Sequence, residues 1–159
     1  MKIDIICVGK LKEKYLVAAM SEYSKRLTRY CKMNIIELTD EKTPDNASEK
    51  EELQIKDKEG EKILAQVKEG AYVVDLALDG KMISSEELAS FMSERALRGD
   101  SHMVFIIGGS LGLSQAVLAR ANYKLCFSRM TFPHQLFRVM LLEQVYRAYR
   151  INNNEPYHK

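Results

Sequence analysis

Three glycines fall within five positions of the segment VFIIGGSLGLSQAVLAR, which spans residues 104–120. An apolar run precedes them and a helix-like pattern follows. Because glycine lets backbone come close to a ligand, the arrangement suits a nucleotide or cofactor site. The loop Gly108–Gly112 is not a Walker A motif, since no Lys-Ser or Lys-Thr pair follows its last glycine, and it lacks the G-x-G-x-x-G spacing of dinucleotide folds. It predicts a cofactor of another kind, with a bare strand–helix turn as the alternative.

The second feature with chemical consequences is the distribution of charge. The net charge is only +2, yet residues 40–69 carry ten acidic and six basic side chains, whereas residues 10–32 and 120–159 each carry seven basic and two acidic ones. In residues 120–159 the arginines alternate with aromatic residues, a pattern that suits a polyanion such as RNA. For residues 10–32 a solvated helix face is an equally good interpretation.

Composition argues against several other kinds of site. The three cysteines are widely separated and lie within or beside apolar runs, which favours reduced, mostly buried thiols in a cytoplasmic protein. The three histidines lack the spacing of metal ligands, so we expect no metal. No apolar run is long enough to cross a bilayer, and the first run contains Asp4 and predicts a strand, not a signal peptide. We therefore expect no membrane partner.

The elements that must position these residues alternate regularly. Ser48 with Glu51, and Ser84 with Glu87, form capping-box patterns that open two helices. Apolar runs and helical periodicity predict strands over residues 2–8, 33–38, 71–78, 102–107 and 123–128, and helices over residues 13–27, 48–67, 84–98, from 114, and 133–151. Five such alternations predict an α/β fold, a mostly parallel five-stranded sheet with helices on both faces.

Three loops follow the third, fourth and fifth predicted strands, over residues 76–81, 108–113 and 127–133. Ligands of parallel sheets bind beyond the carboxyl ends of the strands, so these loops could converge on one pocket. The last helix has apolar residues on more than one face. It is either enclosed in the core or covered by a second subunit, and in a chain of 159 residues we favour a dimer.

Three motifs, in this order along the chain, closely resemble those of the SPOUT (α/β-knot) RNA methyltransferases: IIGGSLGLS, FSRMTFPHQLFRVMLLEQVYRAY and the terminal NNNEPYHK. Within that superfamily the whole chain is most similar to the ribosomal large-subunit pseudouridine N3-methyltransferases. The resemblance implies one domain over residues 1–159, with a C-terminal trefoil (α/β) knot and the cofactor site within about residues 72–159. It also implies S-adenosyl-L-methionine as methyl donor, a homodimer, and a pseudouridine in a 23S rRNA stem-loop of the assembled ribosome as substrate.

Carried over by position, the resemblance implies cofactor contacts from all three loops, at Leu76, Gly108, Phe127, Ser128, Arg129, Met130, Thr131 and Phe132. A sulfonium cofactor needs no phosphate cradle, which explains the missing Walker lysine. On the substrate side the resemblance favours His158 and Tyr157, on a polar tail that could reach the partner's pocket. A disordered terminus is the alternative for that tail.

Other residues near the C-terminus have open assignments. His134 could orient the base or a cofactor loop, or simply cap the last helix. Arg147, with Arg150, could contact phosphate or stabilise a deprotonated base, and Arg138 and Glu143 could form a structural pair. No residue is singled out as the general base. The rival interpretation of the whole chain is a non-catalytic RNA-binding or ribosome-associated factor that keeps the fold and binds RNA without S-adenosylmethionine.

Overall fold

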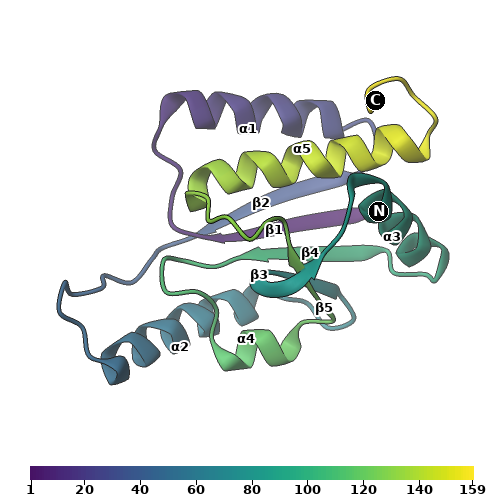
Figure 1. The fold of residues 1–159 in the computed structure, drawn as a ribbon. Helices are drawn as coiled ribbons and strands as arrows, with labels where there is room; N and C mark the ends of the chain where they lie inside the picture. The colour runs from purple at the N-terminus through teal and green to yellow at the C-terminus, as the bar shows by residue number, and fades with distance from the viewer.

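The computed structural model covers residues 1–159 and contains every predicted element (Figure 1). Both capping boxes form. The side chains of Ser48 and Ser84 accept hydrogen bonds from the N–H groups of Glu51 and Glu87, and each glutamate side chain accepts one from the N–H of its serine. The strands are β1 (Lys2–Val8), β2 (Lys32–Leu38), β3 (Tyr72–Met82), β4 (His102–Ile107) and β5 (Tyr123–Cys126), and the helices are α1 (Lys14–Leu27), α2 (Glu49–Gln66), α3 (Ser85–Leu97), α4 (Gln115–Arg120) and α5 (His134–Asn152).

The five strands form one sheet in the order β2-β1-β4-β3-β5, and every neighbouring pair is parallel. Because side chains alternate along a strand, the sheet builds two cores. Ile5 and Phe105 face the core formed with α1, α3 and α5, whereas Ile6 and Ile106 face the core formed with α2 and α4. Figure 1 shows these helix groups on opposite sides of the sheet. The predicted α/β class is confirmed.

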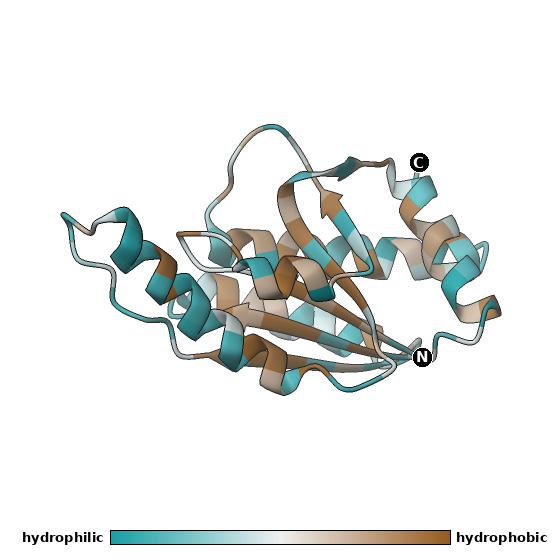
Figure 2. Cartoon of the chain, turned by 90° about the horizontal axis from the view of Figure 1, so that it is seen from below, coloured by the Kyte–Doolittle hydropathy of each residue, from teal (hydrophilic) through white to brown (hydrophobic).

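Hydropathy follows this layering. In Figure 2 the central strands are mainly brown, whereas the outer turns of α2 are mainly teal. Helix α2 belongs to the acidic stretch of the sequence and buries only Glu59, Gly60 and Ile63. No helix is both long enough and apolar enough to span a membrane. All three cysteines are free, with Cys7 and Cys126 buried and Cys31 half-buried.

Helix α5 is enclosed within the chain. It packs against both α1 and α3 and buries Leu141, Leu142 and Val145 in the sheet core. The protein's own helices therefore cover most of its second apolar side, while Leu136 in its first turn stays exposed. The apolar pattern of this helix does not require a second subunit, so the homodimer stays a prediction that rests on the family resemblance.

Strand β3 continues past the predicted turn at Asp79-Gly80. Both Leu76 and Lys81 pair with Leu125 of β5, so the intervening residues bulge out and the chain then returns to the same strand. A Cβ on Gly80 would lie 2.7 Å from the carbonyl carbon of Leu125, which explains the glycine. The predicted end of this strand was wrong because pairing with a distant strand, invisible to local pattern, extends it. The knot stays a prediction, with which this close crossing is consistent.

Candidate functional site

The carboxyl ends of β3, β4 and β5 open into one cavity of about 480 Å³. Its walls are formed by residues 76–79, by Ile107 and the glycine loop 108–113, and by residues from the β5–α5 connection. The three strands are consecutive in the sheet, in the order β4-β3-β5, and all are parallel, so their carboxyl ends lie at one edge of the sheet. The volume suits a small-molecule ligand or cofactor.

Most residues predicted to contact a cofactor line this cavity: Leu76, Gly108, Phe127, Ser128, Met130, Thr131 and Phe132. Arg129 is the exception, since its side chain is exposed and does not contribute to the wall. Local pattern did not single out the apolar wall formed by Ile107, Leu113, Leu118 and Phe137. These side chains belong to four different elements or loops, so only the fold brings them together.

The close packing of the glycine loop on itself requires glycine at two positions. A Cβ on Gly108 would lie 2.8 Å from Cδ2 of Leu113 and 3.2 Å from the carbonyl carbon of Gly112. Gly112 has a φ of +88°, a conformation that other residues rarely adopt, and its N–H donates to the carbonyl of Gly109 over 3.1 Å. The glycines therefore shape the wall by letting the loop fold on itself. The close approach of a ligand to the backbone at Gly108 stays a prediction.

The loop between β5 and α5 offers main-chain groups to a ligand. Two contacts from side chains hold it: Cys126 Sγ donates to the Ser128 carbonyl over 3.1 Å, and the Met130 N–H donates to Ser128 Oγ over 3.0 Å. Apart from these, no hydrogen bond involves the main chain of residues 128–132. Ser128, Met130, Thr131 and Phe132 line the cavity, so their unpaired main-chain groups are available to bind the polar edge of a heterocycle.

His134 lines the same cavity and does not cap α5. The helix begins after Pro133, and no side chain caps its N-terminus. Partial desolvation at the cavity wall, together with the positive charge of Arg138, lowers the pKa of His134 below its ordinary value. This shift favours the neutral imidazole, which has a ring nitrogen free to accept a hydrogen bond.

Arg138 and Glu143 do not form the structural pair that was considered. Arg138 is fully buried and donates to the carbonyls of Val8 and Gly9, at 3.0 and 2.9 Å, and to Glu37 at 2.9 Å. It thereby ties α5 to the ends of β1 and β2. The spacing of five residues places Arg138 and Glu143 on different sides of α5, so each finds its own partners.

The C-terminal tail is ordered and docks on its own chain. Tyr157 donates to Glu143 over 3.0 Å, and Arg147 also donates to Glu143. His158 bridges Arg147 and Glu86, with Nδ1 3.0 Å from Nη1 and Nε2 2.7 Å from Oε1. The structure thus brings together Arg147, Tyr157 and His158, but none of them lines the cavity at the strand ends.

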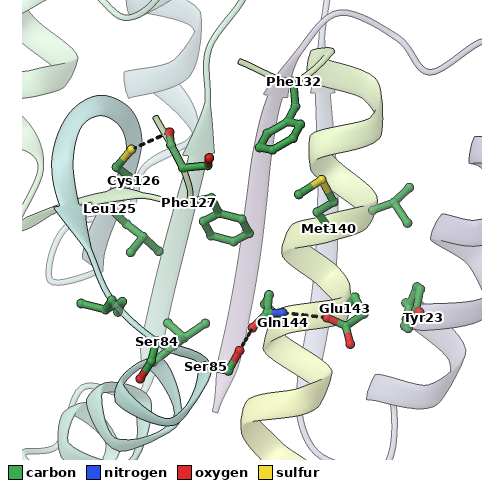
Figure 3. A pocket seen from close by; sticks show the side chains of 14 residues that line it. Tyr23, Ser84, Ser85, Leu125, Cys126, Phe127, Phe132, Met140, Glu143 and Gln144 are labelled. Atoms are coloured by element: carbon green, nitrogen blue, oxygen red, sulfur yellow. Dashed lines mark hydrogen bonds between the residues drawn. The ribbon is translucent and has the colours of Figure 1, made fainter. Parts of the chain in front are cut away.

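A second cavity, of about 520 Å³, lies beside the first, between α5, the start of α3 and Tyr23 of α1 (Figure 3). Five residues line both cavities: Leu125, Cys126, Phe127, Ser128 and Phe132. The new wall contains Ser84, Ser85, Glu143 and Gln144. The sequence predicted only a capping role for Ser84 and no role for Ser85 or Gln144, because no sequence pattern connects residues of α3 with residues of α5.

The fold of this chain is also found in a solved structure of another protein. The chain is similar to a solved structure described as a probable methylase family protein from Haemophilus influenzae Rd KW20, with a TM-score of 0.52 at 14% identity, over 99% of this chain and 70% of that one. This likeness concerns the fold alone. It agrees with a ligand site at the carboxyl ends of a parallel sheet.

The sequence matches the family described as "Predicted SPOUT methyltransferase" over residues 1–158, and the chain belongs to this family. It is 71% identical to a protein of Clostridium botulinum (strain Alaska E43 / Type E3) named "Ribosomal RNA large subunit methyltransferase H", over the full length of both chains. A protein of Clostridium novyi (strain NT) with the same name is 70% identical, again over both full lengths. The family resemblance seen in the motifs is confirmed.

Proposed function

We propose that this protein uses S-adenosylmethionine to methylate ring nitrogen N3 of a pseudouridine in a 23S rRNA stem-loop, acting on the assembled ribosome as a homodimer. The observation that carries the proposal is the cavity where the loops after β3, β4 and β5 meet in a chain of the SPOUT family. The names of its close relatives supply the class of RNA. Such a reaction would take place in the cytoplasm, where ribosomes work.

The cavity fits the methyl donor. Leu76, Phe127 and Phe132 offer apolar surface for an adenine ring, and the unpaired main-chain groups of residues 128–132 can bind its polar edge. The cavity contains no lysine or arginine side chain, in keeping with a cofactor that has no phosphate. When bound, S-adenosylmethionine supplies a methyl group on a positively charged sulfur, and we assign no metal to the reaction.

Residues of this chain must promote loss of the N3 proton of the substrate base. N3 of a uracil-type ring is protonated at neutral pH, so the site has to accept that proton or stabilise the resulting anion. His134 lines the cavity with a lowered pKa and is the candidate acceptor. Arg147 lies beside Tyr157 and His158 and is paired with Glu143, so this group adds hydrogen-bonding side chains and no net positive charge near the second cavity. Enclosure of the ring between apolar walls fixes its approach to the donor.

Two surface features support the proposed partners. Lys12, Lys14 and Lys25 are exposed on or beside α1 and can contact rRNA phosphates. Leu78 and Met130 line the first cavity and are exposed, and Met82 and Leu136, each next in sequence to a residue that lines a cavity, are exposed as well. Apolar side chains gathered around a site suit coverage by a second subunit, as the proposed homodimer requires.

The deciding experiment is methyl transfer from labelled S-adenosylmethionine to ribosomes from cells that lack this protein, with free large subunits and naked rRNA in parallel. We expect label only in assembled ribosomes, on one pseudouridine, with the methyl group at N3 by mass spectrometry of the nucleoside. Tight binding to ribosomes without label on any of the three substrates would instead favour the non-catalytic factor.

A further inference from the structure

The second cavity is placed to hold the group that receives the methyl. Phe127 and Phe132 line both cavities, so the two cavities adjoin and a ring bound in the second would lie next to a ligand in the first. Figure 3 shows Phe127, Phe132 and Met140 around one end of the space and a row of polar side chains at the other. Apolar surface beside a polar row suits a flat heterocycle with a hydrogen-bonding edge.

The polar row consists of Ser85, Gln144 and Glu143, joined in sequence by hydrogen bonds. Ser85 Oγ donates to Gln144 Oε1 over 2.7 Å, and Gln144 Nε2 donates to Glu143 Oε2 over 2.9 Å. The other carboxylate oxygen, Oε1, accepts from Tyr157 and Arg147. Tyr157 and Arg147 thus hold the carboxylate of Glu143, and Ser85 holds the amide of Gln144.

Two hydrogen-bonding positions of this row remain unused. Gln144 has a second N–H, and Glu143 Oε2 accepts only from Gln144 although it can accept more than one bond. The row therefore presents a donor beside an acceptor. The complementary edge of a ligand must carry a carbonyl next to an N–H.

With N3 directed at the first cavity, pseudouridine still offers such an edge, whereas uridine has no second N–H to offer. If N3 of the base faces the first cavity, the neighbouring edge of pseudouridine carries the C2 carbonyl and N1–H. In uridine N1 is bonded to the ribose and has no hydrogen. We propose that the second cavity receives the target base, that Gln144 donates to its C2 carbonyl, and that Glu143 accepts N1–H and so distinguishes pseudouridine from uridine. This inference rests on the proposed function.

The test compares ribosomes whose target nucleotide is pseudouridine with ribosomes that carry uridine there. The preference is measured as a ratio, both of kcat/KM and of Kd with S-adenosylhomocysteine bound. Glu143→Leu removes the acceptor, so we expect the preference of the wild-type protein to fall by about tenfold, the effect of one hydrogen bond to a charged group. Glu94→Leu removes an exposed carboxylate of α3 that pairs with Arg98 and lines neither cavity, so its preference should match the wild-type ratio.

A second variant tests occupancy of the cavity itself. Met140 lines only the second cavity, so Met140→Trp should fill it, leave the Kd for S-adenosylmethionine within about twofold and abolish transfer to both ribosomes. An unchanged preference in Glu143→Leu would refute the role of Glu143. Full transfer by Met140→Trp would show that the base binds elsewhere. Absence of transfer by the wild-type protein, despite cofactor binding, would refute the proposed function instead.

Discussion

Arg147 determines which nitrogen of His158 carries the proton. Its Nη1 lies 3.0 Å from Nδ1 of His158, and a guanidinium can only donate, so Nδ1 accepts and the proton sits on Nε2. Nε2 then donates to Glu86 over 2.7 Å, a bond that lowers the pKa of the Glu86 carboxyl. The last residues are thereby fixed on α5 and α3 of their own chain, beside the second cavity.

Replacement of His158 tests the importance of this tail. We expect His158→Ala to leave the Kd for S-adenosylmethionine nearly unchanged, since the side chain does not line the cofactor cavity, and to lower turnover by about 100-fold if it completes the substrate side. Isothermal titration and single-turnover methyl transfer provide the two readouts. Lys159→Ala, at the exposed neighbouring position, is the matched control. Unchanged turnover in His158→Ala would remove the tail from the site.

Replacement of Gly108 tests the cavity wall. Because the space of a side chain at Gly108 is already taken by Leu113, we expect Gly108→Val to displace the glycine loop and weaken binding of S-adenosylmethionine by at least about tenfold. The Kd measured by isothermal titration checks this. Ala65→Val is the control, since Ala65 is exposed on α2 and lines neither cavity. Retained affinity in Gly108→Val would show that the cofactor binds elsewhere.

Asp75 makes stability depend on pH. Its side chain is fully buried on β3, neither carboxylate oxygen has a hydrogen-bond partner, and burial raises its pKa from 3.8 to about 7, with Lys124 acting weakly in the opposite sense. A pKa higher in the folded than in the unfolded state means that the folded state holds the proton more tightly. The free energy of unfolding should therefore fall as pH rises from about 4 to about 7, by roughly 4 kcal/mol at most.

The variant Asp75→Val isolates this contribution. Valine suits a buried parallel strand and removes the titrating group. We expect the variant to be more stable than the wild-type protein at pH 8, with a smaller gain at pH 5, as measured by urea unfolding at both values. Equal pH dependence in the two proteins would assign the effect to another group.

Replacement of Gly80 tests the close crossing of β3 and β5. A Cβ there would meet the backbone of Leu125 and Lys124 at 2.7 to 2.8 Å, and backbone cannot move aside as a side chain can. We expect Gly80→Ala to cost about 2 kcal/mol of unfolding free energy. Gly99→Ala, where the space is open and only a positive φ opposes the substitution, should cost less. A loss in Gly80→Ala no greater than in this control would mean that the crossing adapts.

The secondary-structure elements could be predicted from the sequence because they depend on residues close together in the chain. Alternation of apolar runs with helical periodicity predicted all ten elements, and Ser48 and Ser84 marked two helix starts through bonds that span only three residues. The three loops around the cavity at the strand ends could also be placed, because the carboxyl ends of parallel strands share one edge. The motifs then identified the family.

Tertiary structure decided whatever depends on partners distant in the chain. Pairing with Leu125 carried β3 beyond its predicted end, and α1 and α3 enclosed a helix whose pattern had suggested a second subunit. Arg138 donates a hydrogen bond to Glu37 of β2 and does not pair with Glu143 on its own helix. The row of Ser85, Gln144 and Glu143 exists only because α3 and α5 pack side by side. Local sequence sets backbone propensity and the apolar face of each element, whereas contacts across the sheet and between helices are fixed only when those faces are buried together.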